Sequence, residues 1–179
     1  DITLTDALLE ASGTDAGGLV RVGGDYQGQG ALPRAQTTHV DDNTLIHANA
    51  LDAGDGGEVI IWSDGTTLFQ GLVTARGGPN GGDGGLVETS GRQSIEIDGG
   101  QVDASAAQGT AGLWFVDPNA IRIDEDLALT IQAALAGGTS FTVSTVDGDA
   151  TDVPPEPVNG DILLGSDINA NAINNATLT

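Results

Sequence analysis

A self-similarity with a period of about 28 residues limits most strongly how this chain can fold. Each period opens with a Gly-Gly pair and alternating apolar residues, at 17–22, 56–61 and 84–89, with a degenerate copy at 111–116. The second glycine of each copy falls at 18, 57, 85 and 112, so the last two steps are 28 and 27 residues. Regular steps of this length indicate stacked structural repeats.

A second motif, an apolar residue followed by any residue and alanine, keeps the same period. It occurs at 46–48, 73–75 and 102–104, in steps of 27 and 29, and again at 168–170. A third apolar pair precedes it, as in Ile95 and Ile97. Three short strands per period predict three-faced coils, each strand pairing with its equivalent one period later, which is a parallel β-helix. A β-sandwich of short antiparallel strands is the alternative, but it explains the alternation without the repeat.

The alternation also predicts which side chains point inward, because successive residues of a strand face opposite sides. One inward face contains Val20, Val22, Val59, Ile61, Val87, Trp114 and Val116. Another contains Ile46, Ala48, Val73, Ala75, Val102 and Ala104. Arg21, Glu58 and Glu88 lie between inward positions and are expected in solvent.

The pattern divides the chain into three parts. Residues 1–118 are expected to form β-helix coils. Residues 119–160 read as an insertion with a short helix near 126–136, a strand and a proline-rich loop. Acidic residues before the helix and Gly137 after it mark its ends, and we expect it to decorate the side of the coils. Residues 161–179 resume the coil pattern, and both termini resemble cuts in something longer.

Charge and composition exclude several classes of protein. The chain has 26 Asp and Glu against five Lys and Arg, so its net charge is −21 and phosphate backbones are repelled. It has no cysteine, which excludes disulfides and cysteine-based zinc sites. No apolar run approaches the roughly 20 residues needed to cross a bilayer. No Gly-x-Ser-x-Gly nucleophile motif occurs, and we expect no catalytic activity and no membrane insertion.

Two glycine- and aspartate-rich segments, 52–57 and 77–85, lie one period apart and resemble calcium-binding turns. Asp55, Asn80 and Asp83 would supply part of the six to eight oxygens that calcium takes. Calcium is therefore the one cofactor that the sequence leaves open. The alternative is that both segments are corner loops, rich in glycine for backbone reasons.

Two aromatic residues are candidates for stacking on a sugar ring. Trp62 follows Ile61 in the outward phase, and Tyr26 lies in a glycine-rich segment. The alternative is that a side loop or the helix covers Trp62. Acidic clusters on a strand face are also compatible with polysaccharide cleavage, but 26 acids make a solvated surface the simpler interpretation.

Residues 23–28 (GGDYQG), 84–91 (GGLVETSG) and 114–119 (WFVDPN) stand in this order and resemble large secreted exoproteins of the filamentous haemagglutinin type. The resemblance extends from about residue 17 to the C-terminus. It implies a right-handed β-helix exported by two-partner secretion in Gram-negative bacteria, with an outer-membrane secretion partner for the parent protein. It also implies a location outside the cell or at the bacterial surface, and glycans or cell-surface receptors as partners, although no binding residue transfers.

The expected function is therefore a non-catalytic shaft segment of a secreted adhesin-like exoprotein, with a role in cell adhesion or biofilm. Two alternatives stay open. One is a subunit of an extracellular filament that assembles by end-to-end stacking. The other is a β-helix that binds or cleaves polysaccharide.

Overall fold

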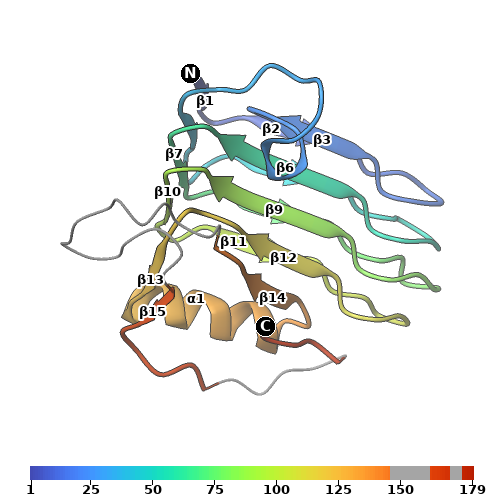
Figure 1. The fold of residues 1–179 in the computed structure, drawn as a ribbon. Helices are drawn as coiled ribbons and strands as arrows, with labels where there is room; N and C mark the ends of the chain where they lie inside the picture. Colours follow the sequence, from blue (N-terminus) through green and yellow to red (C-terminus); the bar gives the residue numbers. More distant parts are fainter. Residues whose placement is uncertain (146–161, 170–174) are drawn as a thin grey trace.

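The computed structural model describes residues 1–145, 162–169 and 175–179, and parallel β-sheets dominate it (Figure 1). The first sheet contains, in order, β1 (Ile2–Leu4), β4 (Thr38–Val40), β7 (Thr66–Phe69) and β10 (Ser94–Ile97). The second contains β2 (Leu8–Glu10), β5 (Leu45–His47), β8 (Leu72–Thr74) and β11 (Gln101–Asp103). The third contains β3 (Leu19–Val22), β6 (Glu58–Ser63), β9 (Leu86–Gly91), β12 (Leu113–Val116) and β14 (Ser140–Val143).

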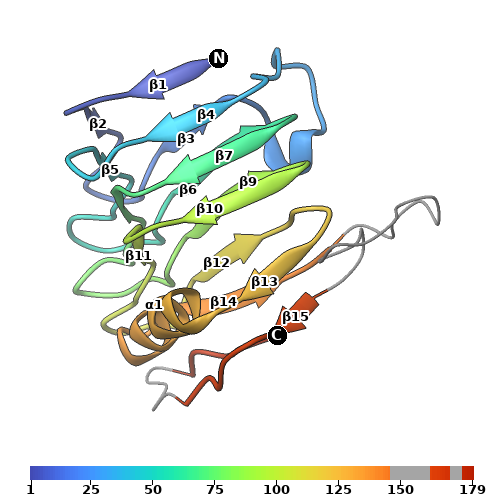
Figure 2. The same cartoon turned by 90° about the vertical axis from the view of Figure 1, so that its left-hand side faces the viewer.

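The chain passes through the first, second and third sheets in turn, four times in succession. We call each passage a coil, so that β1–β3 form coil 1 and β10–β12 form coil 4. Within each sheet every strand pairs in parallel with its equivalent in the next coil, and Figure 2 shows these strands one below another. The three sheets remain separate and open. The predicted all-β, parallel class is confirmed.

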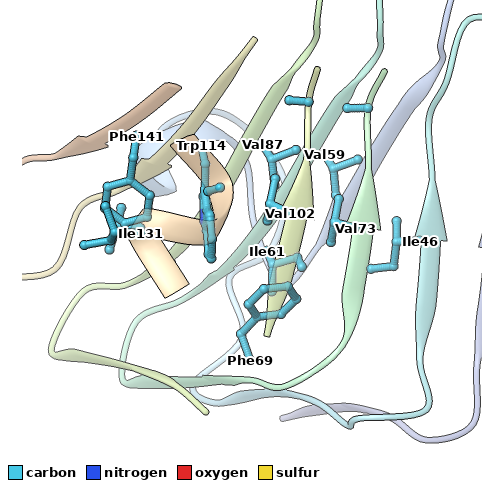
Figure 3. Packing of buried hydrophobic residues seen from close by; sticks show 14 of the residues in the cluster. Ile46, Val59, Ile61, Phe69, Val73, Val87, Val102, Trp114, Ile131 and Phe141 are labelled. Atoms are coloured by element: carbon cyan, nitrogen blue, oxygen red, sulfur yellow. The ribbon is translucent and has the colours of Figure 1, made fainter. Parts of the chain in front are cut away.

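Side chains of successive coils stack in register inside the sheets. Ile46 lies opposite Val73, which lies opposite Val102. Val87 in the third sheet lies opposite Trp114. Figure 3 shows these rows facing one another. All thirteen side chains predicted to point inward from the two motifs are buried. Each step of the repeat, 39 residues from Val20 to Val59 and 27 to 29 residues from coil 2 onward, returns the same phase of the strand to the core.

Aromatic rings fill the core toward the C-terminal coils. Trp114 meets Phe141 edge-on at 5.0 Å between ring centroids and Phe69 at 6.2 Å. Its indole Nε1 donates to Thr89 Oγ1 at 2.9 Å, so the buried polar atom has a partner.

Helix α1 (Glu125–Ala136) confirms the predicted helix but not its expected position. Asp124 caps its first turn by accepting a hydrogen bond from Leu127 N at 3.1 Å. Ile131 is fully buried, and one face of the helix belongs to the same core as the strands. The expectation that the helix decorates the outside is wrong. It stands between β13 and β14 along the chain, where earlier coils have a strand of the second sheet, and contacts β11.

A two-stranded sheet continues the fold below the first sheet (Figure 2). It pairs β13 (Ile121–Ile123) with β15 (Ile162–Leu164). Leu178 forms a bridge with Phe141 at the end of the third sheet. The predicted proline-rich loop, 147–160, lies outside the described residues, and so does Ala170.

Candidate functional site

A segment of the chain between β3 and β4 folds across the outer face of the third sheet. We call residues 23–36 the strap, and it includes the short 3-10 helix η1 (Tyr26–Gly28). Val20 of coil 1 and its equivalent in coil 2, Val59, are 39 positions apart. The next equivalent pair, Val59 of coil 2 and Val87 of coil 3, is only 28 positions apart. The additional residues in the first step form the strap. Figure 1 shows it folded over β6, which η1 contacts.

The strap covers Trp62, the first of the two predicted sugar-stacking residues. The Trp62 side chain points outward from β6, as the alternation predicts, but it is only 4% exposed. A side chain at Gly28 would collide with its indole ring, and the Arg34 guanidinium lies 5.8 Å from the ring centroid. Trp62 is therefore not an exposed platform, and the alternative interpretation, that a side loop covers it, is confirmed.

Tyr26, the second aromatic candidate, lies on the strap and is 37% exposed. Its ring is tilted by 31° against that of Phe115, with 5.8 Å between centroids. This contact attaches the strap to β12, and it leaves part of the Tyr26 ring accessible. Trp62 therefore lies beneath the strap and Tyr26 lies on it, and the two rings do not form one stacking surface.

Glu88 is also under the strap, although we expected it in solvent. It lies outward on β9, in register between Ile60 of β6 and Phe115 of β12, and is fully buried. Gln27 N donates to its Oε2 at 2.9 Å, whereas Oε1 has no hydrogen-bond partner within the described structure. Burial is the main reason that the pKa of Glu88 rises from its usual value of 4.5 to about 7. The charge of Asp117 raises the pKa further, and the Gln27 hydrogen bond opposes the increase.

Gln27 holds a second carboxylate with its side chain. Its Nε2 donates to Asp117 Oδ2 at 3.2 Å. Asp117 N donates in turn to the hydroxyl oxygen of Ser90, in coil 3, at 3.0 Å. The other carboxylate oxygen, Asp117 Oδ1, is buried and has no hydrogen-bond partner in the described part of the chain. One strap residue thus bridges two acids from coil 3 and from the end of coil 4.

A polar groove of about 440 Å³ opens beside this cluster. The strap forms one wall, and the segments after β9 and β12 form the other. Its lining includes Gln27, Gln29, Arg34, Trp62, Arg92, Asp117, Asn119 and Ser144. The two arginines converge on one carboxylate. Asp64 Oδ2 lies 3.1 Å from Arg34 Nε, and Asp64 Oδ1 lies 3.6 Å from Arg92 Nη1.

The predicted calcium residues lie at the glycine-rich corner of successive coils, where the two aspartates accept hydrogen bonds from backbone N–H groups. Asp55 Oδ1 accepts a hydrogen bond from Asp83 N at 2.8 Å, and Asp83 Oδ1 accepts one from Thr110 N at 2.7 Å. Asn80 Nδ2 donates to an oxygen of Asp52. These bonds link each coil to the next, and the Thr110 hydrogen bonds lower the pKa of Asp83. Over the described ranges, no three His, Cys, Asp or Glu residues group in a way that holds a metal ion. Calcium binding stays a prediction.

Sequence reasoning missed Glu88, Gln27, Asp117 and the arginine pair. The one signal that points to them is the long first step of the repeat, since extra residues inserted between strands must fold somewhere. Nothing in the sequence tells which face those residues cover.

Within the described residues, no helix combines the length and the apolar character that crossing a bilayer requires. Comparison of the whole sequence with protein-family models gave no match, and comparison with curated proteins gave no match either.

Proposed function

We propose that this chain is a parallel β-helix that works as a stiff spacer, a shaft segment of a secreted adhesin-like exoprotein. The observation that carries the proposal is the register of the three sheets. Each strand pairs with its equivalent 27 to 29 residues later from coil 2 to coil 4, as for Ile46, Val73 and Val102. A chain built in this way grows along one axis, because each coil contacts mainly its two neighbours.

Stiffness follows from three sets of contacts between successive coils. Backbone hydrogen bonds join every pair of strands, and the apolar rows inside the sheets stack without interruption. The Asp55 and Asp83 side chains bond the backbone of the following coil at the corner. The strap adds a fourth link, because it starts in coil 1 and contacts Trp62, Glu88 and Phe115 in coils 2, 3 and 4.

The finer parts of the proposal are supported by the resemblance to filamentous haemagglutinin-type exoproteins. These parts are a right-handed coil, export through an outer-membrane partner, a place at the bacterial surface, and receptors or glycans as partners. The charge of −21 suits a rod that must stay separate from its copies in solution.

Adding coils tests the spacer function directly. A variant with three further copies of residues 58–85, placed in tandem after residue 85, adds three coils. Its maximum dimension in small-angle X-ray scattering is expected to increase by about 14 Å, at about 4.8 Å per stacked strand. The control inserts a glycine-serine linker of equal length at the same site, which cannot stack.

A longer rod from the tandem variant, with a melting temperature at least as high as that of the parent, supports the proposal. An equal change of dimension from the linker and from the added coils contradicts it. Electron microscopy of the native material gives an independent test. Thin rods much longer than one copy of this chain support a shaft, whereas fibres with a repeat set by this chain favour the filament alternative.

A further inference from the structure

The polar groove beside the strap has a charge balance unlike that of the rest of the molecule. Arg34 and Arg92, two of the five arginines in a chain of net charge −21, both lie in it. Asp64 and Asp117 offset them, so the groove is close to neutral while its surroundings are strongly acidic. An anionic group therefore meets less repulsion there than it would beside carboxylates that no arginine pairs with.

The two arginines differ in how many of their donors are already used. Arg34 donates to Gly28 O at 3.2 Å, pairs with Asp64 at 3.1 Å and lies over the Trp62 ring, so its position is fixed. The Arg92 side chain is 60% exposed, and the ion pair described for it is the 3.6 Å approach to Asp64. Asp64 is shared between the two, which leaves Arg92 with donors directed to solvent.

Arg92 also stands next to the acceptors of the groove. Its carbonyl oxygen accepts a hydrogen bond from Asn119 N at 3.1 Å, which fixes the position of Asn119 beside it. Asp117 lines the groove as well, and its Oδ2 accepts the Gln27 amide at 3.2 Å, whereas its Oδ1 is buried. A carboxylate oxygen accepts more than one hydrogen bond, so Oδ2 has room for a hydroxyl or N–H donor brought by a ligand.

We propose that this groove binds an acidic saccharide, with Arg92 pairing with a uronate carboxylate and Asp117 accepting a hydrogen bond from a sugar hydroxyl. The pairing requires a ligand that carries a negative charge and hydroxyl donors on one compact unit, and a uronic acid residue carries both. The amides of Gln27, Gln29 and Asn119 supply further donors and acceptors for hydroxyls.

Other ligand classes fit the groove less well. Sulfate or chloride has no hydroxyl donor for Asp117 and is repelled by it. A neutral sugar has no partner for Arg92. The volume of about 440 Å³ lies within the range of about 300–1,000 Å³ that is usual for small-molecule sites. This inference goes beyond the spacer function, since a shaft is complete without it.

The test is isothermal titration calorimetry of the whole chain with trigalacturonate as the probe. A chelator is present throughout, so that calcium cannot bridge acidic groups. The neutral galactose trisaccharide and acetate are the comparison ligands. We expect saturable binding of trigalacturonate at least about tenfold tighter than that of either comparison ligand.

The variant R92Q keeps the length and polarity of the side chain but removes its charge. It is expected to weaken binding of trigalacturonate by about tenfold or more, with an unchanged melting temperature. The matched control is R122Q, because Arg122 is exposed on β13 and does not line the groove. It is expected to bind as the parent does.

Three results would overturn the proposal. One is no binding of trigalacturonate, and another is equal binding of the neutral trisaccharide or of acetate. The third is a loss of affinity in R122Q as large as in R92Q, which would mean attraction to positive charge in general. The spacer proposal is unaffected by all three, because it is tested by rod length.

Discussion

The backbone N–H of Gln27 donates a 2.9 Å hydrogen bond to Oε2 of Glu88, a residue 61 positions further along the chain. This bond links the strap of coil 1 to coil 3. It also defines a buried carboxylate with one satisfied and one unsatisfied oxygen. The strap is therefore attached to the rod through a group whose charge depends on pH.

The charge of Glu88 makes stability fall as pH rises from about 4.5 to about 7. Its pKa is raised from 4.5 to about 7 in the folded chain, so the folded state favours the protonated form. The resulting stabilisation is fully present below about pH 4.5 and is lost as pH rises to about 7. The difference in pKa of about 2.5 corresponds to about 3 kcal/mol in the free energy of unfolding. Chemical denaturation between pH 4 and pH 8 measures it.

The variant E88Q removes this titration. We expect it to be more stable than the parent at pH 8 by about 3 kcal/mol and similar to it at pH 4. The control E96Q changes the same side chain at an exposed position on β10, where no such difference is expected. Tyr26, Asp117 and Arg21 also act on Glu88 or respond to it, and they remain in both variants. Equal pH profiles for E88Q and the parent would mean that Glu88 is ionised at no cost.

The repeat predicts correctly which side chains lie in the core, but it does not predict which outward side chains are covered. Inward positions such as Ile46 and Val73 follow from alternation and period, because each side chain packs against its own equivalent in the next coil. Glu88 has the outward phase of the same pattern, yet the strap buries it. Alternation states which way a side chain points, and only the tertiary fold decides what lies above it.

Substitution of Ile46 tests the inward rows. Its side chain is fully buried between equivalents of coils 1 and 3, so I46A is expected to cost about 2–5 kcal/mol in the free energy of unfolding. I46D is expected to prevent folding, because the carboxylate would have no partner in the core. The neighbouring Leu45 points outward and is more than a third exposed, and L45A is expected to cost less than about 1 kcal/mol. Similar losses for I46A and L45A in urea denaturation would contradict the assigned phase.

Asp83 tests the links between coils at the glycine-rich corner. Its Oδ1 accepts the Thr110 N–H at 2.7 Å, so D83A is expected to lower the melting temperature. D83N keeps an oxygen at the same place and is expected to melt close to the parent. Since the Thr110 hydrogen bonds lower the pKa of Asp83, its contribution is lost only when pH falls through that lowered value. Equal melting of D83A and D83N above pH 5 would show that the hydrogen bond contributes nothing.

The same thermal scans test the calcium prediction for Asp55, Asn80 and Asp83. A calcium ion bound by these residues would raise the melting temperature of the parent and would be removed by a chelator. D83N should then lose the calcium effect while keeping its stability in the chelator. An identical melting temperature with calcium and with the chelator would leave the corner as a purely structural link.

The candidate site depends on contacts that no local pattern contains. Gln27 and Asp117 are 90 positions apart in the sequence. They meet because the strap lies across coils that come later in the sequence. The helix shows the same limit. Its residues and its Asp124 cap could be read from sequence, but its place in the core depends on the space beside β11.

The backbones of successive coils approach each other closely at the glycine-rich corners. A Cβ added at Gly57 would collide with the carbonyl oxygen of Gly18, which belongs to the preceding coil. The Gly18 oxygen is a backbone atom and the added Cβ is bonded directly to the backbone, so neither can move without disturbing the pairing of β3 with β6. G57A is therefore expected to cost more than about 3 kcal/mol, whereas G137A, at the exposed end of α1 with its nearest contact at 3.3 Å, is expected to cost less than about 1 kcal/mol. Urea denaturation of the two variants measures the difference. Equal stability would mean that the coils are further apart at this corner than described.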